Sequence, residues 1–232
     1  MREFLIGLAI LCAYFILCAS IAVFFRKTIK IPNELFRKIL HFVLLTSLFV
    51  FVFAYDTWWI SALTCLCIIV AAYPILFFFE RFKTYSDTVT ERKKGELRSS
   101  LIIVFVMFAT VIAVCWGWLG DKILTLAVIY AWGYGDAFAA LIGTKYGKHK
   151  IYKKKSFEGT LAMFITSFMV VFIILMLHNI MPWYGTLVCT TAVSVVVSAV
   201  ELYTPDGLDT ITCPFASMLT MLPIILLFGG IG

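Results

Sequence analysis

Long apolar runs alternate with short polar segments along the whole chain of 232 residues. A helix needs about 20 apolar residues to cross the roughly 30 Å hydrocarbon core of a bilayer. Eight runs come close to this length, and each predicts a membrane-spanning helix: 4–25, 39–55, 57–79, 99–118, 122–142, 158–180, 184–203 and 213–231. The pattern therefore predicts an all-α fold, a polytopic membrane helix bundle with seven or eight spans.

The composition excludes a water-soluble globule. Hydrophobic residues make up 62% of the chain, charged residues only 14%, and the mean hydropathy is +1.02. A soluble domain is nearer half apolar and a quarter charged. No repeat or shift in composition marks a boundary, so we expect a single integral membrane domain over 1–232. The first run has no charge and exceeds the length of a signal-peptide core, which favours a retained helix.

The basic residues mark one side of the predicted bundle. Three long polar connections and their edges hold 17 of the 19 lysines and arginines. Membrane proteins keep such loops in the cytoplasm, so we expect a basic cytoplasmic face and both termini outside. This topogenic role explains the net charge of +6 without nucleic acid. The seven cysteines form no C-x-x-C pair and indicate neither disulfides nor a metal cluster.

Asp136 is the acid that fits a plain apolar bundle least well. It lies within the fifth predicted span, and a charge at membrane depth usually faces a wet cavity or a partner. At helical spacing it shares a face with Ala140, Gly143 and Gly147, where a backbone or ligand can approach closely. Two interpretations stay open: a structural ion pair with a neighbouring helix, or a functional site.

The segment that follows, 147–160, combines lysines with a helix start. Its lysines alone indicate topogenic charge or binding of anionic lipid head groups. Ser156 can cap the sixth predicted helix with Glu158 in its first turn, and helix N-termini favour phosphate oxygens. Cations for phosphate charge and carboxylates for Mg²⁺ are what phosphoryl transfer needs. No Walker A loop is present.

Two further clusters are predicted on the same face. Arg37 and His41 are one helical turn apart beside Lys38, either as structural residues or as phosphate contacts. The segment 201–209 contains three acids around a Pro/Gly turn, which indicates either an ordinary turn or further metal ligands.

These residues resemble the signature of the polyprenol kinase family, which includes CTP-dependent dolichol kinases, phytol kinases and fungal-type diacylglycerol kinases and is related to phosphatidate cytidylyltransferases. The specific part is Gly135-Asp136-Ala-x-Ala-Ala-x-x-Gly143-x-x-x-Gly147-Lys148 followed by Lys155-Ser156-x-Glu158-Gly159-Thr160. Further similar features are Arg37-Lys38-x-x-His41, Arg92-x-x-Gly95-Glu96 and the acidic loop, where Asp209-Thr210 departs from the Asp-Asn usual in the family. The signature-bearing part is 121–215.

The resemblance implies transfer of the γ-phosphate of CTP to the hydroxyl of a membrane lipid alcohol, with a divalent metal such as Mg²⁺. It implies that Asp136 is a metal ligand or the base for the lipid hydroxyl. The implied catalytic residues are Asp136, Lys155 and Glu158, and the implied metal ligands are Asp136, Glu158, Glu201 and Asp209. The nucleotide would contact Arg37, Lys38, His41, Gly135, Gly143, Gly147, Lys148, Ser156 and Gly159.

Two other functions remain open at this point. A phosphatidate cytidylyltransferase would transfer CMP to phosphatidate and release pyrophosphate. A small ion-coupled transporter would use Asp136 as a relay, although transporters often show inverted repeats and broken helices in both halves. The sequence leaves the lipid alcohol and the oligomeric state unidentified.

Overall fold

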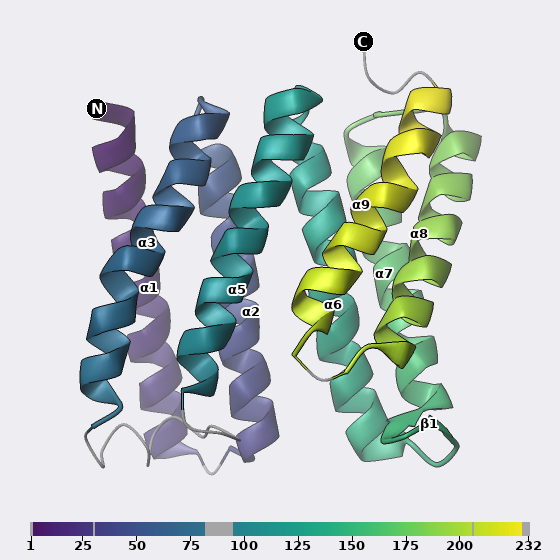
Figure 1. Cartoon of the computed structure of the whole chain (residues 1–232). Helices are drawn as coiled ribbons and strands as arrows, with labels where there is room; N and C mark the ends of the chain where they lie inside the picture. Colours follow the sequence, from purple (N-terminus) through teal and green to yellow (C-terminus); the bar gives the residue numbers. More distant parts are fainter. Residues whose placement is uncertain (1, 30, 82–94, 206, 229–232) are drawn as a thin grey trace. The chain divides into compact units, whose positions relative to one another are not determined.

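A computed structural model describes residues 2–29, 31–81, 95–205 and 207–228 of the chain (Figure 1). These residues form two compact units, 1–113 and 114–232, apart from the positions just excluded. Within the described residues, eight helices are long and apolar enough to cross a membrane. This confirms the predicted all-α polytopic bundle. Continuous apolar helices suit a bilayer because each backbone N–H and C=O is satisfied inside its own segment.

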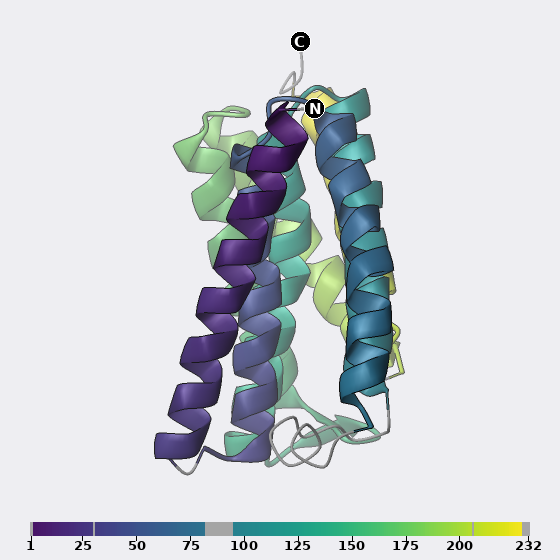
Figure 2. The same cartoon turned by 90° about the vertical axis from the view of Figure 1, so that its left-hand side faces the viewer.

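Unit 1 is built from two helix pairs (Figure 2). Helix α1 packs against α2, and α3 packs against α5. Their core is aromatic: Phe51 of α2 contacts Phe105 and Phe108 of α5, with ring centroids 5.8 and 6.2 Å apart. The helices span α1 Arg2–Thr28, α2 Asn33–Phe53, α3 Trp58–Phe79 and α5 Glu96–Val111, with a π-helical turn η1 Ile112–Trp118 after α5.

Unit 2 is a four-helix bundle in which α6 contacts the other three helices. Neighbouring helices also pair as α7 with α8 and α8 with α9, which closes the ring. Asp121 caps the start of α6 by accepting a hydrogen bond from the N–H of Ile123 at 2.7 Å. The elements are α6 Lys122–Tyr146, β1 Lys150–Tyr152, β2 Lys155–Ser156, α7 Phe157–Leu177, α8 Trp183–Tyr203 and α9 Asp209–Leu227.

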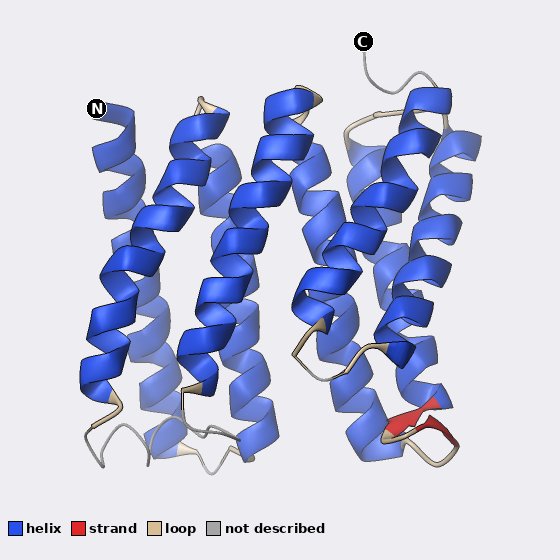
Figure 3. Ribbon diagram, in the orientation of Figure 1, coloured by secondary structure: helices blue, strands red, loops and turns tan. Residues whose placement is uncertain are grey.

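A short β-hairpin between α6 and α7, drawn in red in Figure 3, was not predicted from the sequence. Strands β1 and β2 are antiparallel, with Lys150 opposite Ser156 and Tyr152 opposite Lys155. The turn between them holds Lys153 in the left-handed region, at φ 49°. A run of lysines gives no hydrophobic alternation, so the usual strand signal is absent. The hairpin fixes which lysine faces the helices.

Small residues bring α6 and α7 into close contact. A Cβ on Gly135 would lie 2.6 Å from Oγ of Ser167, which donates a hydrogen bond to the Ala131 carbonyl at 2.5 Å. At the hairpin end, a Cβ on Gly159 would lie 3.3 Å from Cα of Gly143. Helix packing in membranes relies on such small residues because lipid removes the hydrophobic drive for association. Gly143, from the small-residue face predicted on α6, therefore lies at a helix–helix interface.

Several predictions lie beyond what the structure addresses. Arg92 and Asp206 are outside the described residues. The single membrane domain and the outside position of both termini stay predictions.

Candidate active site

Lys155 is the lysine of the hairpin that turns toward the helices. Its side chain is 20% exposed, whereas Lys153 and Lys154 in the turn are exposed. Pairing with Tyr152 orients β2, and the Tyr152 ring contacts the Tyr203 ring of α8 at 5.4 Å. The hairpin is thereby held against the C-terminal end of α8.

The Lys155 ammonium group is surrounded by oxygen atoms at the end of α8. Its Nζ lies 2.8 Å from Oε1 of Glu201 and donates to the Thr204 carbonyl at 3.1 Å. It also donates to the Glu201 carbonyl. The last carbonyls of a helix have no partner within it and carry partial negative charge, so a cation is stabilised there. Lys155 thus caps the C-terminal end of α8 and also neutralises the Glu201 carboxylate.

Three acids from three helices meet electrostatically at this end of unit 2. Glu201 of α8 is 9% exposed, and the charges of Asp136 on α6 and Asp209 on α9 act on its carboxyl group. All three also act on the thiol of Cys213. Lys155 pairs with Glu201, and Asp136 and Asp209 lie half-buried within electrostatic range of that carboxyl group. The assignment of these acids as metal ligands stays a prediction.

Asp136, Glu201 and Asp209 have carboxylate oxygens suited to Mg²⁺, but they are not arranged as a complete set of metal ligands. Carboxylate oxygens are the ligands that Mg²⁺ prefers. Next to Glu201 along α8, the hydroxyl of Ser198 is buried and has no hydrogen-bond partner. In the described ranges, no group of three or more His, Cys, Asp or Glu side chains is placed to hold a metal ion. The donor types fit, and Mg²⁺ stays a prediction.

Glu158 has a different set of contacts from the other predicted ligands. Its carboxylate accepts hydrogen bonds from the N–H groups of Lys148 and His149, at 3.2 and 3.3 Å. Its Oε1 is also 2.7 Å from Nδ1 of His149. The side chain is 24% exposed and orders the backbone that leads from α6 into the hairpin. In this structure Glu158 closes a loop, and its role as a metal ligand stays a prediction.

Ser156 and the nearby glycines form the tightest part of the α6–α7 interface. Ser156 is 4% exposed, and its Oγ accepts a hydrogen bond from the Gly159 N–H at 3.3 Å, as the predicted N-cap. A Cβ on Gly147 would lie 2.5 Å from that Oγ, and one on Gly143 would lie 3.4 Å from it. Packing and capping account for these residues, and their contact with a nucleotide stays a prediction.

The predicted basic cluster of the second span belongs to unit 1. Nη1 of Arg37 lies 3.4 Å from Oε1 of Glu96, so the two family-like segments at 37–41 and 95–96 meet within that unit. Lys38 is buried at 7% exposure, and His41 is half-buried. Both have interaction partners in the structure. Contact of Arg37, Lys38 and His41 with a nucleotide stays a prediction.

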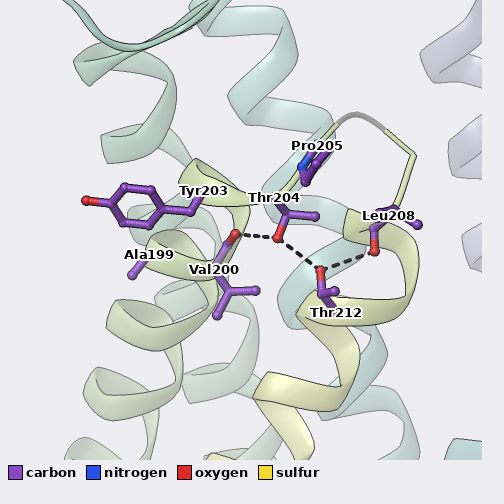
Figure 4. Close-up of a pocket in the computed structure, with 7 residues that line it drawn as sticks. All are labelled: Ala199, Val200, Tyr203, Thr204, Pro205, Leu208 and Thr212. Atoms are coloured by element: carbon purple, nitrogen blue, oxygen red, sulfur yellow. Dashed lines mark hydrogen bonds between the residues drawn. The ribbon is translucent and has the colours of Figure 1, made fainter.

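Thr204, Thr212 and His149 were not predicted from the sequence as site residues. Thr204 ends α8 and contacts Lys155 through its carbonyl, while its hydroxyl lies 3.2 Å from that of Thr212 on α9 (Figure 4). Neither threonine has a spacing relation to the lysines or acids that a motif would show. Glu201 pointed indirectly to Thr204, because the turn that includes Thr204 directly follows this predicted ligand.

The chain is similar to two curated phytol kinases. It is 31% identical over 104 residues to a phytol kinase of Synechocystis sp., a match that covers 44% of each chain. It is 28% identical over 174 residues to a probable chloroplastic phytol kinase of Triticum aestivum, covering 71% of this chain and 55% of the relative. The chain thus spans about half the length of these relatives. No family model matches, and no solved structure matches at a significant level. The two relatives confirm the resemblance to the polyprenol kinase family.

Proposed function

From this kinship we propose that the chain is a CTP-dependent lipid kinase, which transfers a phosphoryl group to the hydroxyl of a membrane lipid alcohol at the cytoplasmic face. The two relatives are phytol kinases by name, which supports an isoprenoid or similar long-chain alcohol as substrate. The observation that carries the proposal is the Lys155–Glu201 ion pair at one end of unit 2, with Asp136 and Asp209 in electrostatic range of Glu201.

The proposed reaction is an in-line displacement at the γ-phosphorus of CTP. The lipid hydroxyl oxygen forms the new P–O bond, and the bond from the γ-phosphorus to the bridging oxygen breaks, so that CDP leaves with the electron pair. Asp136 receives the hydroxyl proton. Phosphoryl transfer depends on positioning and charge stabilisation more than on covalent catalysis, which suits a site made of one cation and several carboxylates.

Lys155 would exchange its present oxygen partners for phosphate oxygens when the nucleotide binds. Its ammonium group already contacts a carboxylate and backbone carbonyls, so the position suits anionic oxygen. Lys148 would add positive charge to the proposed triphosphate site. Glu201 and Asp209 would hold the divalent metal, and Asp136 would act as the base. A bound Mg²⁺ would neutralise charge on the phosphate oxygens.

The proposal is tested with purified full-length chain in proteoliposomes that contain candidate lipid alcohols or phosphatidate. CTP labelled at the α- or the γ-phosphate, and ATP labelled at γ, are compared as donors. We expect label to enter the alcohol from γ-labelled CTP alone. Label from the α position in phosphatidate would identify a cytidylyltransferase instead, and transfer from ATP at an equal rate would overturn the CTP dependence.

A further inference from the structure

A shallow pocket lies beside the Lys155–Glu201 pair, where α8 ends and α9 begins (Figure 4). Its volume is about 420 Å³, within the roughly 300–1,000 Å³ of typical ligand pockets. Most of its lining is apolar side chain and the polar groups are few. The lining residues are Ala199, Val200, Tyr203, Thr204, Pro205, Leu208 and Thr212.

The polar part of this lining is a pair of threonine hydroxyls. Thr204 donates to the Val200 carbonyl at 2.6 Å, and Thr212 donates to the Leu208 carbonyl at 3.1 Å. The two hydroxyl oxygens also lie 3.2 Å apart. Each hydroxyl has one proton and two acceptor lone pairs. The pair has two protons and four acceptor lone pairs, so it keeps surplus acceptor capacity whichever contacts the protons serve, and it favours a ligand that donates a hydrogen bond.

Thr204 connects this pocket with the reactive groups. Its hydroxyl faces Thr212 in the pocket, while its backbone carbonyl accepts a hydrogen bond from Nζ of Lys155 at 3.1 Å. A ligand hydroxyl held by the threonine pair would therefore contact Thr204, the residue whose carbonyl also contacts the Lys155 ammonium group proposed to bind phosphate. The pocket is also at the ends of two membrane-spanning helices, where an apolar chain can remain in the lipid.

We infer that this pocket binds the lipid alcohol before transfer, with the alcohol O–H donating to the Thr204–Thr212 pair until its proton passes to Asp136, and with the hydrocarbon chain covering Tyr203 and Leu208. This inference rests on the proposed kinase function and adds the substrate subsite. Tyr203 and Leu208 are 65% and 52% exposed, so an apolar chain has side-chain surface to cover. A carboxylic ester of the same alcohol lacks the O–H and would lose this hydrogen bond.

The first experiment separates a specific subsite from general contact with lipid. Thr212→Val removes the hydroxyl and keeps the shape. Thr220→Val is the matched control, because Thr220 is on the same helix and its hydroxyl also donates to the backbone one turn earlier, at 2.7 Å to Ala216. We expect Thr212→Val to raise KM for the alcohol at least fivefold, with KM for CTP unchanged, and Thr220→Val to change neither. Equal alcohol KM in both variants would overturn the inference.

The second experiment does not depend on turnover. The wild-type chain in proteoliposomes is photolabelled with a long-chain isoprenoid alcohol that bears a diazirine, and labelled residues are mapped by mass spectrometry. We expect labelling in 199–212 that the free alcohol suppresses and its acetate ester does not. Labelling spread over the lipid-facing sides of all the helices, or suppressed equally by the ester, would overturn the inference. If the pocket is labelled but no γ-phosphate is transferred, the alcohol subsite stands and the kinase proposal fails.

Discussion

Nζ of Lys155 lies 2.8 Å from Oε1 of Glu201, although 46 residues separate the two along the chain. The pair joins the hairpin to the end of α8 and places a cation among three acids. It has a structural role, as a cap and counter-charge, and a proposed chemical role with phosphate.

Replacing Lys155 by Met tests both roles of the pair. The change leaves Glu201 buried without its cation, so we expect a loss of about 1–3 kcal/mol in stability, below the roughly 3–5 kcal/mol of a fully buried pair because Lys155 is 20% exposed. Thermal unfolding in detergent measures this loss. Lys154→Met, at the exposed turn, is the control and should unfold like the wild type.

The double variant Lys155→Met with Glu201→Gln distinguishes stability from chemistry. It removes both charges, so part of the lost stability should return, while phosphoryl transfer should stay at least 100-fold below wild type. Activity that recovers together with stability would show that Lys155 acts only as a structural cap.

Asp136→Asn keeps the size of the side chain and removes its charge. As the proposed proton acceptor, Asp136 should contribute about 10²–10⁴-fold to the rate, so we expect kcat to fall by that factor with the fold unchanged. Asp121→Asn is a matched control at the other end of α6, since Asn caps a helix about as well as Asp. A wild-type rate in Asp136→Asn would disprove the assignment.

Gly147→Ala tests the close contact between α6 and the hairpin end of α7. The added methyl group would lie 2.5 Å from Oγ of Ser156, so we expect a loss of about 1–3 kcal/mol from overpacking. At Gly143 the same atom would lie 3.4 Å from Ser156 Oγ, an ordinary contact. Unfolding temperatures of the two alanine variants should therefore differ, and equal values would contradict the packing account.

Arg37 and Glu96 form a partly exposed ion pair in unit 1, with side chains 29% and 28% exposed. Such pairs contribute about 0–1 kcal/mol, so Arg37→Ala and Glu96→Gln should change stability little and to the same extent. If Arg37 also binds the triphosphate, Arg37→Ala alone should raise KM for CTP about tenfold. Matching KM values in the two variants would remove Arg37 from the nucleotide site.

The eight spans could be predicted because a bilayer demands long continuous apolar helices, and sequence shows such runs directly. The ends were less accurate. Helix α2 begins at Asn33 instead of 39 because Arg37 and Lys38 lie inside its first turns, where their partners and the helix edge accommodate charge. A hydropathy pattern cuts a helix at the first charged residue and so shortens it.

The sequence allowed several residues of the candidate site to be predicted, but not how those residues are arranged in space. Asp136 stood out as an acid inside an apolar span, and Glu201 as an acid at the end of one. Local spacing alone did not separate Lys155 from Lys153 and Lys154, although the family resemblance singled it out, because only the register of the hairpin turns it toward α8. The acids and cation meet through helix packing, which leaves no trace in local spacing.

The crowded position of Lys155 has a consequence for selectivity among anions. An ammonium group that already has a carboxylate and two carbonyls as neighbours gains little from inorganic phosphate or chloride, because such a ligand must first replace those oxygens. A chelating polyphosphate supplies several oxygens at once and can offset that cost. If the proposed function holds, the hairpin thereby disfavours small anions relative to a nucleotide at this site.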